Sequence, residues 1–132
     1  MKVLLLAIVA LAATGCMGRT ASSGGGSAEG TSLKISISLG AGKGAPTKLW
    51  TLQCPKGGTL PDASQACAKL DRLADPFGPV PKNLSCTEVF GGPQVATVQG
   101  TFRGQPVNTE FSRSDGCQIA RWNRVRFLFP SA

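Results

Sequence analysis

The sequence contains no histidine. Without histidine, neither a Ser-His-Asp triad nor a Cys-His nucleophile pair can be assembled, and a metal centre with imidazole ligands is excluded. Carboxylates are few, and Asp62, Asp71 and Asp75 all belong to one predicted helix and its exit. Glycine-rich phosphate-binding motifs of the P-loop or dinucleotide type are absent as well. These absences indicate a protein that is not an enzyme and needs no cofactor.

A long apolar run is also absent. The longest, Val3 to Ala13, has eleven residues, which is too short to span a bilayer as a helix. Lys2 precedes it and small residues follow it, so we interpret residues 1–15 as an export signal. The sequence ATGC, which ends at Cys16, resembles a bacterial lipobox, in which the cysteine becomes the lipidated N-terminus. We expect a lipoprotein tethered to the outer face of the cell membrane; ordinary cleavage nearby, giving a secreted protein, is the alternative.

A flexible linker separates this cysteine from the folded part. Residues 16–32 are rich in glycine and serine and contain almost no apolar side chains. Such a chain reaches roughly 20–25 Å root-mean-square. The remaining stretch, 33–132, is long enough for one domain.

The cysteine count predicts two disulfides. Of the five cysteines, removing Cys16 leaves four: Cys54, Cys67, Cys86 and Cys117. An even number in a small exported domain is typical of disulfides, each stabilising by about 3–4 kcal/mol. A zinc or other metal site is disfavoured because the chain has no CxxC pair and no histidine. Spacing alone leaves all three pairings open.

Hydrophobic periodicity predicts an α+β fold with an antiparallel sheet. Strands are expected at 33–39, where Leu33 and Ile35 alternate with polar residues, and at 48–54. Residues 61–74 carry a helical stripe, with Pro61 and the Asp62/Gln65 pair as its start. The other expected segments are a proline-rich loop at 75–83, a hairpin formed by 94–102 and 105–111, and a closing strand at 124–129.

The chain is basic, with a formal net charge of +7. Arg121, Arg124 and Arg126 flank Trp122 and Phe127, a pattern that could stack bases or follow phosphates. We interpret Arg124 and Arg126 instead as the solvent face of the expected last strand. An exported domain meets little nucleic acid, so we expect no nucleic-acid partner; anionic polymers of the cell envelope suit the charge better.

Three stretches together resemble the subtilisin inhibitor-like family of secreted serine-protease inhibitors: TLQCPKGGTLPDASQACAKLDRLA, CTEVFGGPQVATVQGTFRGQPV, and FSRSDGCQIARW with VRFLF. The resemblance extends from about residue 33 to the C-terminus. It implies an antiparallel sheet with one or two helices packed on one side, and a homodimer. It also implies the disulfides Cys54–Cys67 and Cys86–Cys117.

The resemblance further implies a reactive site at Glu88–Val89. Ser85, Cys86, Thr87 and Phe90 would contact the protease around this bond. Family members present a large apolar or basic residue where Glu88 stands, and an asparagine that supports the loop where Asp115 stands. Taken without the resemblance, CTEVF reads as a plain strand edge with a solvated glutamate.

The partner implied is an extracellular serine endopeptidase, either subtilisin-like or glutamate-specific. The alternative is a lipid-anchored binding module of the cell envelope, built on the same scaffold but without inhibitory activity. Under both hypotheses the protein contacts the membrane only through the lipid at Cys16.

Overall fold

A computed structural model describes residues 30–132 of the chain. The predicted signal, Cys16 and most of the linker lie outside the described residues. Within 30–132, none of the helices has the length and apolarity needed to cross a membrane.

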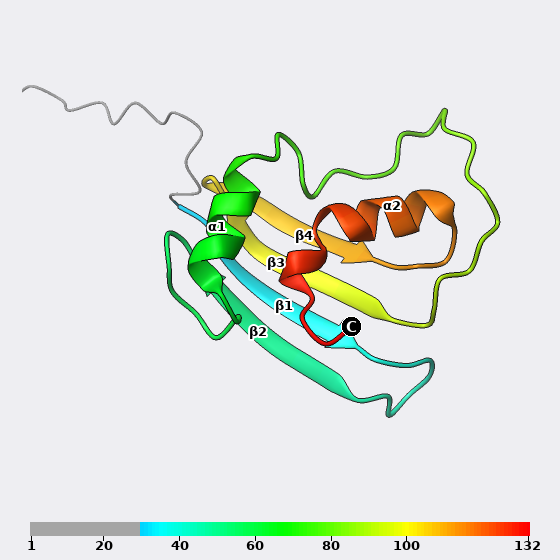
Figure 1. Cartoon of the computed structure of the whole chain (residues 1–132), viewed down its shortest axis with the longest axis horizontal. Helices are drawn as coiled ribbons and strands as arrows, with labels where there is room; N and C mark the ends of the chain where they lie inside the picture. The colour runs from blue at the N-terminus through cyan, green and yellow to red at the C-terminus, as the bar shows by residue number, and fades with distance from the viewer. Residues whose placement is uncertain (1–29) are drawn as a thin grey trace, which may run out of the picture.

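One four-stranded antiparallel sheet forms the centre of the domain (Figure 1). The strand order is β2-β1-β3-β4, and the bounds are β1 Ser32–Ser38, β2 Thr47–Gln53, β3 Val95–Phe102 and β4 Gln105–Phe111. These four predicted strands are confirmed. On β1 the side chains of Leu33, Ile35 and Ile37 are buried and that of Lys34 is exposed, because alternate residues of a strand point to opposite faces.

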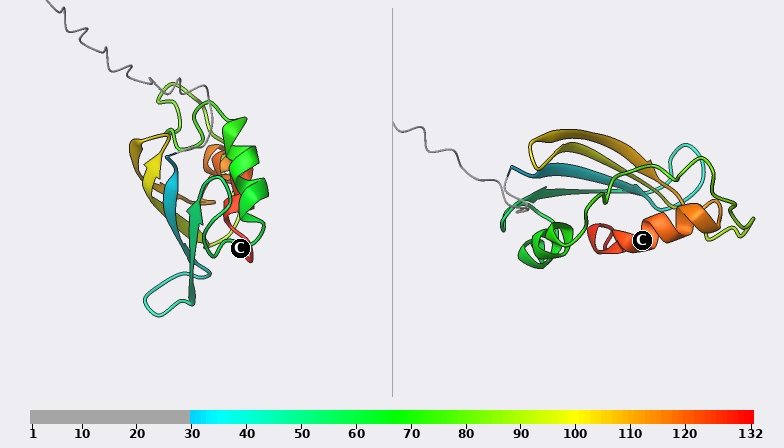
Figure 2. Two further views of the ribbon diagram at one scale, coloured as in Figure 1. Left: turned by 90° about the vertical axis from the view of Figure 1, so that its left-hand side faces the viewer. Right: turned by 90° about the horizontal axis from the view of Figure 1, so that it is seen from above.

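The helices lie together on one face of the sheet (Figure 2). They are α1 (Ala63–Asp71), α2 (Gly116–Arg124) and the short 3-10 helix η1 (Arg126–Leu128). The α+β class, the antiparallel sheet and the packing of helices on one side are therefore confirmed. The core between the two layers is built from apolar side chains of both, including Ile35, Leu52, Leu70, Val98, Phe111, Trp122, Val125 and Leu128.

Both implied disulfides are present. Cys54 is bonded to Cys67, with 5.6 Å between their Cα atoms, and this bond ties α1 to the end of β2. Cys86 is bonded to Cys117, with a Cα separation of 5.3 Å.

The prediction of a closing strand at 124–129 is wrong. This stretch forms the end of α2 followed by η1. The buried side chains are Trp122, Val125, Leu128 and Phe129, which recur every three or four residues as a helical face does. The alternation of Val125, Phe127 and Phe129 that favoured a strand is therefore incidental, and Arg124 and Arg126 do not form the solvent face of a strand.

The first helix starts where predicted, with Asp62 as its N-cap, but the capping interaction expected there is not formed. Helix α1 begins at Ala63, and the preceding Asp62 has a left-handed backbone with φ 54° and no side-chain capping bond. An N-cap normally has an extended backbone, from which its side chain reaches the free N–H groups of the first turn. Asp62 and Gln65 therefore do not form a capping box, and the helix is shorter than the stripe predicted.

The β3–β4 hairpin closes through a two-residue turn. Phe102 pairs with Gln105, and both Arg103 and Gly104 have positive φ angles, 50° and 77°. Such a turn matches the natural twist of two antiparallel strands. The guanidinium of Arg103 donates to the carbonyl of Asp71 at 3.0 Å, which connects the hairpin to the end of α1.

Candidate functional site

The long connection between α1 and β3 carries the predicted reactive site. It passes around α2 in Figure 1, and every residue from 81 to 90 is exposed. None of the residues 83–94 belongs to a helix or strand. The prediction of a loop at 75–83 is confirmed, and the loop continues to the start of β3.

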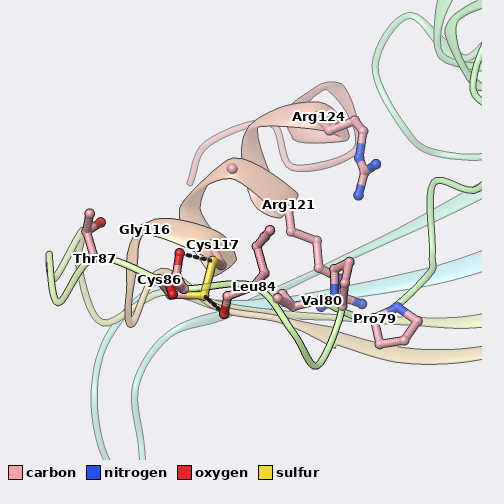
Figure 3. Close-up of a pocket in the computed structure, with 12 residues that line it drawn as sticks. Pro79, Val80, Leu84, Cys86, Thr87, Gly116, Cys117, Arg121 and Arg124 are labelled. Carbon is pink, nitrogen blue, oxygen red and sulfur yellow. Dashed lines mark hydrogen bonds between the residues drawn. A yellow bond between two sulfur atoms is a disulfide. The ribbon is translucent and has the colours of Figure 1, made fainter.

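Two contacts hold the N-terminal side of this loop to the start of α2. The first is the Cys86–Cys117 disulfide. In the second, the N–H of Gly116 donates to the carbonyl of Thr87 at 2.9 Å. Gly116 is the first residue of α2, so its N–H has no partner within the helix and is free to donate. A Cβ at Gly116 would overlap the Thr87 hydroxyl, so this close approach requires glycine. Figure 3 shows Cys86 and Cys117 beside Gly116.

A third contact holds the C-terminal side of the loop. The N–H of Gly91 donates to the carbonyl of Arg113 at 2.7 Å. A Cβ at Gly91 would lie 2.8 Å from Cδ1 of Ile119, so a larger residue would require the Ile119 side chain or the loop to shift. The Arg113 side chain donates to the side chain of Gln94, the last residue of the loop, at 3.3 Å. The stretch 112–117 thus holds both sides of the loop.

Between these contacts, Glu88, Val89 and Phe90 extend into solvent. Val89 is 58 % exposed and Phe90 69 % exposed. In the described part of the chain, no hydrogen bond involves the backbone or side chain of these three residues. The backbone N–H and C=O of Glu88 are therefore free to pair with another molecule.

Arg121 holds the approach to this loop in place. Its side chain is 6 % exposed, and its guanidinium donates to the carbonyls of Gly78 at 2.7 Å and Glu110 at 2.6 Å and to the Thr109 hydroxyl. It also lies 4.2 Å from the centre of the Phe111 ring.

Burial lowers the pKa of Arg121, and the nearby charge of Arg124 lowers it further, whereas the charge of Asp75 raises it. Arg121 therefore connects the loop, β4 and α2 through a single side chain.

Asp115 has a different partner from the one its family position implied. Its carboxylate accepts a hydrogen bond from the N–H of Gln118 at 2.9 Å and so caps α2. Asp115 lies near Cys86 and Cys117, but these two sulfurs are bonded to each other and offer no thiolate to a metal. The cluster is therefore a helix cap beside a disulfide.

The predicted contact residues Ser85 to Phe90 lie together on one exposed segment. Three residues that position this segment were not assigned that role from the sequence: Arg113, Gly116 and Arg121. The sequence does contain a pattern that predicts α2, the helix that carries Gly116 and Arg121. Asp115 precedes a run in which Ile119 and Trp122 are three residues apart, which is typical of a capped helix.

The geometry defines a class of protein, a small disulfide-bonded α+β domain that presents a short exposed segment held at both sides. Residues 29–114, more than half of the chain, match the subtilisin inhibitor-like family. The chain belongs to this family. The matched region contains Glu88 and Val89 and three of the four paired cysteines.

The chain was also compared with curated proteins and with solved structures. No curated protein matched the sequence. Among solved structures, the chain is similar to Streptomyces caespitosus sermetstatin, which was crystallised in complex with Bacillus licheniformis subtilisin. The identity is 20 %, the match covers 75 % of this chain and 96 % of that chain, and the TM-score is 0.48.

Proposed function

We propose that the protein inhibits serine endopeptidases, subtilisin-like or glutamate-specific, by presenting Glu88–Val89 to their active site as a substrate. Membership of the subtilisin inhibitor-like family supports the class of activity. The observation that carries the assignment of the site is the exposed stretch Glu88–Phe90, held on both sides by residues 112–117.

Tight binding follows from an ordered loop. A flexible segment loses conformational entropy when a protease fixes it, whereas an ordered one loses less. The free backbone groups of Glu88 suit the strand-like pairing by which proteins take up extended peptides. Val89 and Phe90 add exposed apolar surface for burial in the complex.

Slow release follows from the contacts on each side. Cleavage of Glu88–Val89 adds water and leaves a carboxylate on Glu88 and an amine on Val89. The first end stays tied through Cys86–Cys117 and Thr87, and the second through Gly91. Because the two ends remain close, the bond can re-form, and the protease stays occupied.

We further propose that the mature protein is a homodimer that is anchored outside the cell by a lipid at Cys16. The family resemblance supports the dimer, and the ATGC sequence supports the anchor. Sedimentation of the domain at micromolar concentration tests the dimer. We expect a sedimenting mass twice that of one chain.

A panel of three proteases tests the inhibitory function. We expect inhibition of subtilisin or a glutamate-specific protease and very weak inhibition of trypsin. Long incubation with the inhibited enzyme should leave a mixture of intact protein and protein cut at Glu88–Val89. If the protein inhibits none of the three enzymes, the non-inhibitory binding module is the better description.

A further inference from the structure

A groove lies beside the reactive loop (Figure 3), and apart from Ser85, Cys86 and Thr87 and the two α2 residues bonded to them, its lining has no part in the function proposed so far. Its volume is about 590 Å³, and it lies between the segment 79–87 and helix α2. Its walls are mainly apolar and include Pro79, Val80, Pro81, Leu84 and Ala120. Leu84 is 55 % exposed, so its side chain adds apolar surface that a partner could bury.

One positive charge is available at this groove. Arg124 lines it, is exposed, and takes part in none of the side-chain hydrogen bonds of residues 30–132. Arg121 also lines the groove, but its guanidinium is used by Gly78, Thr109 and Glu110. A second, smaller hollow shares Pro79, Pro81 and Arg124 with this groove. The groove therefore offers apolar contacts and one cation whose hydrogen-bond donors are free.

The groove is continuous with the reactive loop. Cys86 and Thr87 line it, and the next residue is Glu88. Specific protein complexes bury about 800 Å² on each partner, which is more than a three-residue tip provides. A protease that holds Glu88 must cover further surface next to the loop, and the groove is part of that surface.

We propose that this groove is a second contact site for the inhibited protease, one that receives an apolar side chain next to a carboxylate from the rim of the protease's active site. The proposal rests on the inhibitory function proposed above. The prolines keep the walls rigid, so that little conformational entropy is lost on binding. Arg124 would donate charge-assisted hydrogen bonds to the carboxylate. The groove would then select among proteases independently of Glu88.

Two matched pairs of variants test the apolar and the charged parts. Leu84→Ser removes apolar surface from the groove. Leu49→Ser is its control, since Leu49 is 59 % exposed on β2 and lies on the face opposite the helices. Arg124→Gln removes the charge, and Lys34→Gln removes a charge from the exposed face of β1.

Inhibition constants for subtilisin and for a glutamate-specific protease provide the readout. We expect Leu84→Ser and Arg124→Gln each to weaken inhibition of the enzyme that wild type inhibits best by about tenfold. Both controls should stay within about twofold of wild type. The effect of Arg124→Gln should shrink at high salt, because ions screen the attraction between exposed charges. Thermal unfolding of all four variants checks that the fold is retained.

Hydroxyl-radical footprinting provides a readout that needs no mutation. Leu84 should be protected in the complex with the protease, while Leu49, with a similar exposed fraction, should be oxidised as in the free protein. If Glu88 variants change inhibition but Leu84 is not protected and the groove variants match their controls, the groove proposal is overturned and the inhibitory function stands. If wild type inhibits neither enzyme, both proposals fail.

Discussion

Glu88 places a carboxylate at the exposed tip of the loop, where it would enter the specificity pocket of the protease. Burying a carboxylate in an apolar pocket is unfavourable unless hydrogen-bond donors meet it. A trypsin-like pocket is worse still, because it contains an acid of its own that repels Glu88. A pocket built for glutamate instead gains charge-assisted hydrogen bonds.

Substitutions at Glu88 should therefore change the target. We expect Glu88→Lys to create a trypsin inhibitor, since lysine pairs with the acid of that pocket. Glu88→Met should strengthen inhibition of subtilisin by at least about tenfold, since an apolar side chain avoids the desolvation penalty. Inhibition constants against the three proteases measure both effects. An unchanged profile for both variants would show that Glu88 is not the specificity residue.

Arg121 is the second residue whose environment makes a prediction. Replacing it with methionine keeps much of the side-chain volume but leaves the carbonyls of Gly78 and Glu110 and the Thr109 hydroxyl without their donor. Unsatisfied buried polar groups are costly, so we expect Arg121→Met to lower the free energy of unfolding by about 2–4 kcal/mol. Urea denaturation measures this change. Arg124→Met, on the same helix but exposed, should change stability by no more than about 0.5 kcal/mol.

At the scale of elements, the decisive feature is the attachment of the loop that carries Glu88 to the connection between β4 and α2 and to the start of α2. The hydrogen bond from Gly91 to Arg113 joins the loop to this connection, and the Cys86–Cys117 bond and the hydrogen bond from Gly116 to Thr87 join the loop to the first two residues of α2. The Cys54–Cys67 bond joins β2 and α1 on the other side of the domain. The two disulfides therefore have separable effects.

Removing Cys86–Cys117 should convert the inhibitor into a substrate. We expect the Cys86→Ser/Cys117→Ser variant to be cut rapidly at Glu88–Val89 and to release the protease, because one cut end is no longer held. Mass spectrometry of the digest and recovery of protease activity measure the conversion. The Cys54→Ser/Cys67→Ser variant should lose about 3 kcal/mol of stability or more but, while folded, should still inhibit. Equal loss of inhibition in both variants would argue against a specific role for Cys86–Cys117.

At the scale of the whole molecule, the proposed lipid anchor determines where inhibition takes place. A lipidated cysteine followed by a flexible linker would hold the domain within tens of ångströms of the membrane surface. The cysteine lies outside the described residues, so the anchor is a proposal from the sequence. Inhibition would then be confined to proteases that reach the cell surface.

The substitution Cys16→Ser tests this anchor. We expect the wild-type protein in the membrane fraction of the bacterial host, and the variant either in the medium or retained unprocessed. Immunoblots of the fractions measure the distribution, with Ser23→Ala in the linker as a control that should remain anchored. Equal amounts of soluble wild-type and variant protein in the medium would contradict lipidation.

Much of this fold could be predicted from the sequence because its strands and first helix have strong local patterns. The alternation around Ile35 and the helical stripe that contains Leu70 each identify their element and the face that it buries. The hairpin turn at Arg103-Gly104 is local in the same way. Residues Glu88 to Phe90 were placed by the family resemblance, and the residues alone favoured a strand edge there.

Tertiary structure decided the features that depend on contacts between distant residues. The segment 124–129 satisfies a strand pattern through Phe127 and Phe129 and a helical one through Trp122 and Val125, and only packing against the sheet selects the helix. Gly91 meets Arg113, and Thr87 meets Gly116, across more than twenty residues of chain. The burial of Arg121 depends on acceptors from the long loop and from β4, which are distant from it in the sequence. The sequence determines what each segment can form by itself, whereas the holding of the reactive loop arises only when β4 and α2 have packed beside it.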